Sequence, residues 1–156
     1  MSNVEARLKE MGHELPDPPV PAAAYHPSTI SGNTIYVSGQ IPVVNGTIIA
    51  HGKVGSEHDL EAAQKIAEAC ALNVITVLKV AAEKVGKTLD DVRVVRLSGF
   101  VAVAPGFTDI HLVTNGASHL IHGAFQDQGV HARSAVGMAE LPLGVPFELE
   151  AIAEFN

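Results

Sequence analysis

The clearest alternation of hydrophobic and polar positions lies at the C-terminal end of the chain. Such a period of two is typical of a β-strand, whose successive side chains point to opposite faces of a sheet. One face of the predicted strand, over residues 145–155, holds Phe147, Leu149, Ala151, Ala153 and Phe155, and the other holds Glu148, Glu150, Ile152 and Glu154. We therefore predict one face in the core and one face open to chemistry or solvent.

Further strands are predicted upstream. Residues 34–41 alternate, residues 92–103 are rich in β-branched side chains, and a strand near 135–139 precedes the C-terminal one. Asn45-Gly46 between apolar residues indicates a hairpin that needs positive φ. The run Leu141–Gly144 is predicted to be the turn between the last two strands.

Three stretches have the spacing of helices. A short helix is predicted within residues 2–11, and a second within 108–128. The longest is predicted to follow a capping box at Ser56 and to end at Gly86. Four prolines between positions 16 and 21 favour an extended linker.

This order of elements predicts an α+β layered domain that spans residues 1–156, of which 1–21 are an N-terminal helix and a Pro-rich linker. The length of 156 residues and the 47% hydrophobic content suit one core.

Charge and motifs exclude several classes of function. The net charge of −7 argues against a nucleic-acid surface, which is usually basic. The single cysteine, Cys70, fits a reducing compartment. We expect no signal peptide, because residues 1–10 lack its apolar run, and no membrane span, because no stretch approaches the roughly 20 apolar residues that cross a bilayer. We expect a cytoplasmic protein without membrane contact.

No cofactor or metal is expected. The eight histidines form no HExxH motif, and His119 and His122 lack a third ligand. Phosphate-binding glycine loops are missing from the sequence, and Cys70 on an apolar helix face is expected to pack in the core.

Arg133 and Glu148 are the candidate chemical groups of the C-terminal segment. If the turn at Leu141–Gly144 joins two antiparallel strands, both side chains frame one pocket. Small neighbours leave the guanidinium room for a bidentate grip on a carboxylate. The alternatives are a surface arginine paired with Glu140, and one solvated glutamate among three.

The residues around this segment resemble a known family. Ala132-Arg133-Ser134, with Leu141-Pro142 and the strand that follows, is similar to the C-terminal signature of the Rid (reactive intermediate deaminase) family, also called YjgF-like or L-PSP endoribonucleases. Tyr25 and its spacing to Ser38-Gly39-Gln40 form a second match, and residues 69–78 resemble the family's first long helix. The resemblance covers about residues 22–155, and the extra N-terminal residues place the chain in a longer subgroup.

The resemblance implies a chorismate-mutase-like fold, with a mixed β-sheet packed by two helices, here extended by the N-terminal helix. It also implies a homotrimer, in which active sites lie between subunits and residues of different chains meet.

The resemblance assigns roles to individual residues. It implies that Arg133 holds a substrate carboxylate, that Glu148 holds and activates water, and that the Tyr25 phenol closes the pocket. Tyr25 has the alternative of simply packing beside a strand.

Four further positions are implied to bind substrate. Ser38 and Gly39 correspond to a segment whose backbone amides approach an oxygen atom, with an ordinary bulged strand as the alternative. Asn115 matches the family asparagine, although His111 competes for that position, and Ala135 stands where a cysteine is common. His131 replaces the usual proline before Ala132-Arg133.

The implied activity is a cofactor-independent hydrolysis of enamine or imine acids to 2-keto acids and ammonia. The alternative is a module that binds a small carboxylate, such as a 2-keto acid, without turnover. The family's older description as an endoribonuclease or translation inhibitor is disfavoured by the acidic charge.

Overall fold

The protein is built on a five-stranded mixed sheet. The computed structural model describes residues 1–19 and 24–156. The strands lie in the order β1-β2-β7-β5-β6; only the pair β5 and β6 is parallel. Their bounds are β1 Ser28–Ser31, β2 Thr34–Gln40, β5 Val92–Ala102, β6 Ala132–Met138 and β7 Phe147–Phe155. The predicted α+β class and mixed sheet are confirmed, whereas β1 was not predicted.

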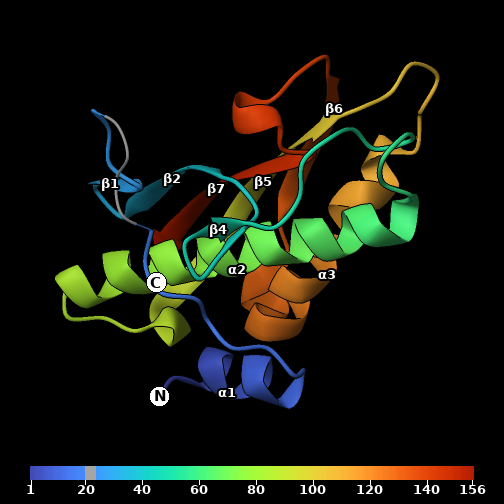
Figure 1. Ribbon diagram of the computed structural model, residues 1–156. Helices are drawn as coiled ribbons and strands as arrows, with labels where there is room; N and C mark the ends of the chain where they lie inside the picture. Colours follow the sequence, from blue (N-terminus) through green and yellow to red (C-terminus); the bar gives the residue numbers. More distant parts are fainter. Residues whose placement is uncertain (20–23) are drawn as a thin grey trace.

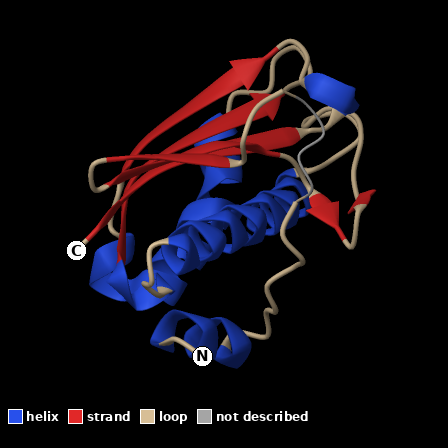
Figure 2. Cartoon of the chain, turned by 90° about the vertical axis from the view of Figure 1, so that its left-hand side faces the viewer, coloured by secondary structure: helices blue, strands red, loops and turns tan. Residues whose placement is uncertain are grey.

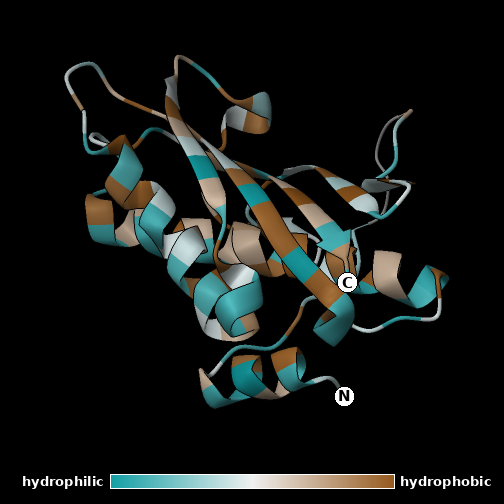
Figure 3. Ribbon diagram, turned by 180° about the vertical axis from the view of Figure 1, so that it is seen from behind, coloured by the Kyte–Doolittle hydropathy of each residue, from teal (hydrophilic) through white to brown (hydrophobic). Residues whose placement is uncertain are grey.

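Two helices, α2 (Leu60–Lys84) and α3 (Ile110–Phe125), cover one face of the sheet (Figures 1 and 2). Their buried side chains meet those of β5 and β7 in the core. The other face of the sheet carries no helix of the described chain (Figure 2). Seen from behind, the long strands show alternating hydrophobic and hydrophilic bands (Figure 3), as expected for strands with one buried face.

The long helix begins later than its predicted cap. Asp59 is the N-cap, and its side chain accepts a hydrogen bond from Ala62 N. Ser56 lies in the preceding turn, where its hydroxyl donates to the Glu57 carboxylate. The capping box at Ser56 was therefore wrong, because Ser56, Glu57 and His58 donate their backbone N–H groups to Lys53 O in a separate turn, and the helix begins only after Asp59.

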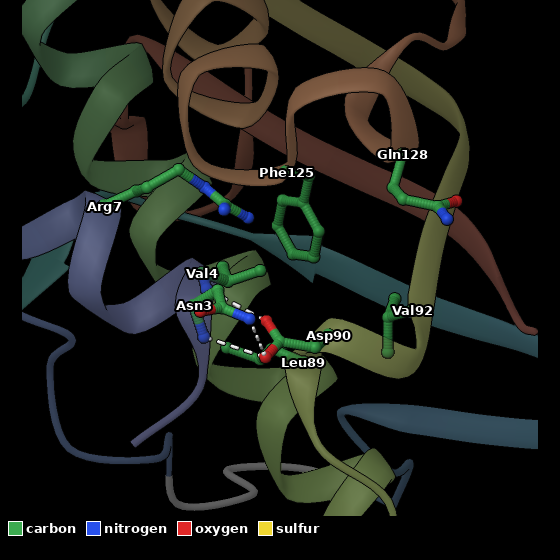
Figure 4. A pocket seen from close by; sticks show the side chains of 8 residues that line it. All are labelled: Asn3, Val4, Arg7, Leu89, Asp90, Val92, Phe125 and Gln128. Carbon is green, nitrogen blue, oxygen red and sulfur yellow. Dashed lines mark hydrogen bonds between the residues drawn. The ribbon is translucent and has the colours of Figure 1, made fainter.

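The N-terminal helix, α1 (Asn3–Glu10), packs on the outer side of the helix layer (Figure 1). Val4 and Leu8 are buried against that layer. Asp90, in the short 3-10 helix η1 (Leu89–Asp91), accepts hydrogen bonds from Asn3 N at 2.8 Å and Val4 N at 3.0 Å (Figure 4). The helix predicted within residues 2–11 is confirmed. Part of the proline linker, residues 20 and 21, lies outside the described residues.

The predicted hairpin is present as β3 (Val43–Val44) and β4 (Thr47–Ile48). Asn45 and Gly46 occupy its turn with φ values of 50° and 76°. Asn73 of α2 donates to the carbonyl oxygens of Ile41 and Val43, both at 3.0 Å, and so holds the start of the hairpin on the helix.

The arrangement of the last two strands differs from the prediction. The turn at 141–144 exists, as the 3-10 helix η3 (Pro142–Gly144) after Leu141, but β6 and β7 do not pair. β5 lies between them, parallel to β6 and antiparallel to β7. A turn between two strands shows that the chain reverses, but it does not show that the two strands pair. The apolar β5 pairs along both of its edges and therefore lies between β6 and β7.

Candidate active site

Arg133 lies on β6 and reaches across to α3. Its Nη1 donates to Asn115 Oδ1 at 2.8 Å and to Ser118 Oγ at 3.1 Å, and its Nη2 donates to His111 O at 3.1 Å. These bonds occupy three of the five N–H donors of the guanidinium, as far as the described residues show. Nε and the second proton of Nη2 remain, which suits a bidentate ligand.

Both candidates for the family asparagine are next to Arg133, but they contribute differently. Asn115 contacts the guanidinium through its side-chain oxygen, whereas His111 contacts it through its backbone carbonyl. Ala135 follows Arg133 by two positions, so both side chains lie on the same face of β6. We refer to Arg133, Asn115, Ser118 and Ala135 as the arginine group.

The charge of Arg133 has no partner of opposite sign in the described part of the chain. No ion pair there includes it, and burial lowers the pKa of the guanidinium, which nevertheless stays cationic. Glu140, the alternative partner, instead pairs with Lys53 at 2.8 Å. A half-buried cation held by neutral acceptors is an environment that favours an anionic ligand.

Glu148 lies near the start of β7, against Gly39. A Cβ atom added at Gly39 would lie 1.9 Å from Glu148 Oε1, so only glycine leaves space for this carboxylate. A bulge in β2 creates the approach, because Val37 pairs with Ala151 but Gln40 already pairs with Leu149. The glycine therefore makes room for a side chain, a role that the sequence did not indicate.

The carboxylate of Glu148 is half-buried on the sheet face that the helices leave open. Desolvation, assisted by the negative charge of Glu150, raises the pKa of Glu148 above its ordinary value. A carboxylate with a raised pKa is a stronger base than an exposed one, and so it is suited to accept a proton.

Ser38 lies on β2, and Tyr25 lies in the loop before β1. The Ser38 hydroxyl donates to His26 O at 2.7 Å, and Ser38 N donates to Pro27 O at 2.9 Å. These bonds hold the loop that carries Tyr25, a residue that is 57% exposed. We refer to Glu148, Gly39, Ser38 and Tyr25 as the glutamate group.

The two groups lie on opposite faces of the sheet. Arg133 pairs with Leu97, which is buried under the helices, whereas Glu148 alternates with the buried Phe147 and Leu149 and therefore points the other way. The prediction that Arg133 and Glu148 frame one pocket of a single chain was wrong, because β5 separates their strands and the register places them back to back.

Two cavities in the described residues lie elsewhere. One, of about 160 Å³, is the seam where α1 docks (Figure 4), and its Asp90 and Arg7 are already bonded to Asn3, Val4 and Ala124. The other, of about 230 Å³, lies between α2 and the hairpin beside Leu15 and Val44. Neither contains a residue of the arginine or glutamate group.

The described residues also contain no cluster of three or more His, Cys, Asp or Glu side chains placed to bind a metal ion. Within the same residues, every helix is too short or too polar to cross a bilayer. Cys70 is buried, and desolvation raises the pKa of its thiol, so it packs in the core as expected.

The sequence did not single out Ser118 and His131. Ser118 follows Asn115 by three positions on α3, which places both on one helical face. His131 was noted only as a departure from the usual proline, although its ring lies 2.9 Å from Ser118 Oγ. The helical spacing from Asn115 was the available signal for Ser118.

Comparison with known proteins then gives the family. The family model described as Endoribonuclease L-PSP matches residues 15–155. The chain belongs to this family. It is the YjgF/Rid family of the predicted resemblance, and its α+β fold, a mixed sheet covered by helices, is the fold found here.

Individual relatives support the assignment. Protein TCP17 of Trypanosoma cruzi is 38% identical over 98% of this chain and 94% of its own. The crystal structure of Atu1372 from Agrobacterium tumefaciens is 46% identical, with a TM-score of 0.90 over 98% of this chain and 92% of that one. TdcF of E. coli, solved with bound serine, shares the fold with a TM-score of 0.64 at 24% identity, over 89% and 94% of the two chains.

Proposed function

We propose that this protein is a cofactor-independent deaminase that hydrolyses small enamine or imine acids. Water adds to the imine carbon, the C–N bond breaks, and a 2-keto acid and ammonia are released. Arg133 holds the substrate carboxylate through its two remaining donors, and Asn115 fixes the guanidinium from the other side. Glu148 accepts the proton of the attacking water.

The observation that carries this proposal is the unmatched charge of Arg133. The guanidinium is half-buried and bonded to three neutral oxygen atoms, with no carboxylate among its described partners. Leaving a cation in this state is costly unless an anion completes the site. Serine bound to TdcF, a member of the same fold, is a carboxylate of comparable size.

The site is proposed to form between copies of a homotrimer. In one chain the arginine and glutamate groups face away from each other, so one substrate cannot touch both. A neighbouring copy packed on the open sheet face brings its own arginine group to the glutamate group. Such packing also covers exposed apolar residues of that face, for example Tyr36, which is 49% exposed.

Mixing two inactive variants tests the shared site. Arg133→Ala lacks the carboxylate grip and Glu148→Gln lacks the base, and each alone is expected to be inactive. After the subunits are exchanged by reversible dissociation, a random mixture has both native groups at about one quarter of its interfaces. We expect about one quarter of the parent's turnover of 2-aminoacrylate; no recovery in demonstrably mixed trimers would contradict a shared site.

A binding module without turnover is the second candidate, and Ala135 leaves the choice between the two open. This position carries a methyl group instead of the thiol that is common in the family. In that case Arg133→Ala still loses 2-keto acid binding, measured by calorimetry, but the parent hydrolyses no small imine acid. RNA cleavage is not supported, because the net charge is −7.

A further inference from the structure

His131 and Ser118 form a chain of hydrogen bonds behind Arg133. His131 Nδ1 lies 2.6 Å from Gly129 O, and His131 Nε2 lies 2.9 Å from Ser118 Oγ. Arg133 Nη1 donates to the same Oγ at 3.1 Å. A carbonyl only accepts, so Nδ1 carries the proton, and the neutral ring accepts the Ser118 hydroxyl proton at Nε2.

We propose that Ser118 and His131 are positioning residues that hold the Arg133 guanidinium in its ligand-binding orientation. A serine within a helix otherwise tends to donate to the carbonyl four residues earlier. His131 takes this proton instead, and the oxygen of Ser118 then presents its lone pairs to Arg133. The carboxylate part rests on the proposed function, whereas the ordering of Arg133 does not.

The charges around His131 predict a proton-linked response. Desolvation lowers the pKa of His131, and so do Arg133 on β6 and His122 on α3, while the Gly129 carbonyl raises it. Protonation of Nε2 would remove the acceptor that the Ser118 hydroxyl needs. We therefore expect anion binding to weaken as the pH falls through the pKa of His131, and, by reciprocity, anion binding to release a proton from His131.

The first measurement needs no ligand. Nitrogen-15 NMR should show an ordered Arg133 Nε–H and a neutral His131 with its proton on Nδ1. Ser118→Ala and His131→Ala are expected to broaden or shift the Arg133 signal, whereas His131→Gln supplies an acceptor oxygen and preserves it. His119→Ala is the control, because His119 is an exposed residue of α3, the helix that carries Ser118.

The second measurement is calorimetry with pyruvate near pH 6, in buffers of different ionisation heat. We expect Ser118→Ala and His131→Ala to weaken binding roughly three- to tenfold, the equivalent of one hydrogen bond. On binding, the parent should release more protons than His131→Gln, which lacks the titrating ring.

The outcomes separate the two proposals. An Arg133 signal that does not change in Ser118→Ala and His131→Ala overturns the positioning role. If a variant with alanine fails to fold, the same proton exchange in the parent and in His131→Gln overturns it instead. A signal that does change, in a parent that binds no keto acid, supports positioning and rejects the proposed function.

Discussion

Replacing Gly39 by alanine tests whether this residue exists to make room for Glu148. The new Cβ would lie 1.9 Å from Glu148 Oε1 and 2.8 Å from its Cδ. Non-bonded carbon–oxygen contacts are roughly 3.3 Å or longer, so Oε1 has to move by about 1.4 Å, the difference between 3.3 and 1.9. The carboxylate end of a flexible side chain can make this movement without unfolding the sheet.

We expect Gly39→Ala to lower turnover rather than stability. A catalytic group displaced by about 1 Å loses roughly a hundredfold in rate, or about 2.7 kcal/mol of transition-state stabilisation. Stability should change by no more than about 1 kcal/mol, because Gly39 lacks the positive φ that would strain an alanine. Steady-state hydrolysis of 2-aminoacrylate and thermal unfolding measure both quantities.

A double-mutant cycle tests whether the loss of turnover in Gly39→Ala acts through Glu148. In a Glu148→Ala background the carboxylate is gone, so adding Gly39→Ala should not slow the residual reaction further. Gly123→Ala is the matched control, because its Cβ meets only the flexible Met11 side chain, at 2.8 Å, far from Glu148 in the fold. If Gly39→Ala is equally harmful in both backgrounds, the glycine acts through its backbone amide instead. Parent-like turnover in the single variant would refute the close approach itself.

Three further predictions follow from charges and hydrogen bonds described above. Burial raises the folded-state pKa of Glu148, so the contribution of its neutral form to stability is lost as the pH rises through that pKa. Glu148→Gln should therefore have a higher melting temperature than the parent at pH 7. At about pH 3.5, where the Glu148 carboxyl is neutral, the two melting temperatures should be the same. A parent with the higher melting temperature at pH 7 would contradict this. Glu150→Gln removes the second cause of the shift, so the acidic limb of the kcat–pH profile, where Glu148 becomes protonated, should move to lower pH; an unmoved limb would mean that Glu148 is not the titrating base. Asp90→Ala removes the acceptor for two backbone N–H groups of α1 and should lower the free energy of unfolding in urea by about 1 kcal/mol without changing kcat. Asp127→Ala, in the short 3-10 helix η2 (Gln126–Gly129), serves as a surface control.

Most elements were predictable because their periods are local. Alternating hydrophobic and polar residues predicted the strands over 34–40 and 147–155, and turn-forming residues predicted the hairpin at Asn45. The place of β5 between β6 and β7 was not, because strand order depends on which edges meet after the chain has crossed over. That one difference separates Arg133 from Glu148, so the two side chains do not frame one pocket within the chain.

The contacts within the arginine and glutamate groups were also only partly predictable from the sequence. The family pattern named Arg133 and Asn115 as separate site residues, and the structure brings Arg133 Nη1 to 2.8 Å from Asn115 Oδ1. Ser118 and His131 were missed because their contact depends on how α3 docks against β6. The space that Gly39 leaves for Glu148 depends likewise on the bulge in β2, which no periodicity reveals.

The short N-terminal helix has a consequence for local unfolding. Its eight residues are too few to be helical alone, so their order depends on Val4, Leu8 and the bonds to Asp90, which is 86 positions from Val4. Contacts this distant in sequence form only after the core has brought their partners together. We expect α1 to dock late in folding and to open first in hydrogen exchange, at a free energy well below that of α2. The α1 segment lies before residue 15, where the family match begins, so we expect α1 to detach and dock again while the shared core stays folded.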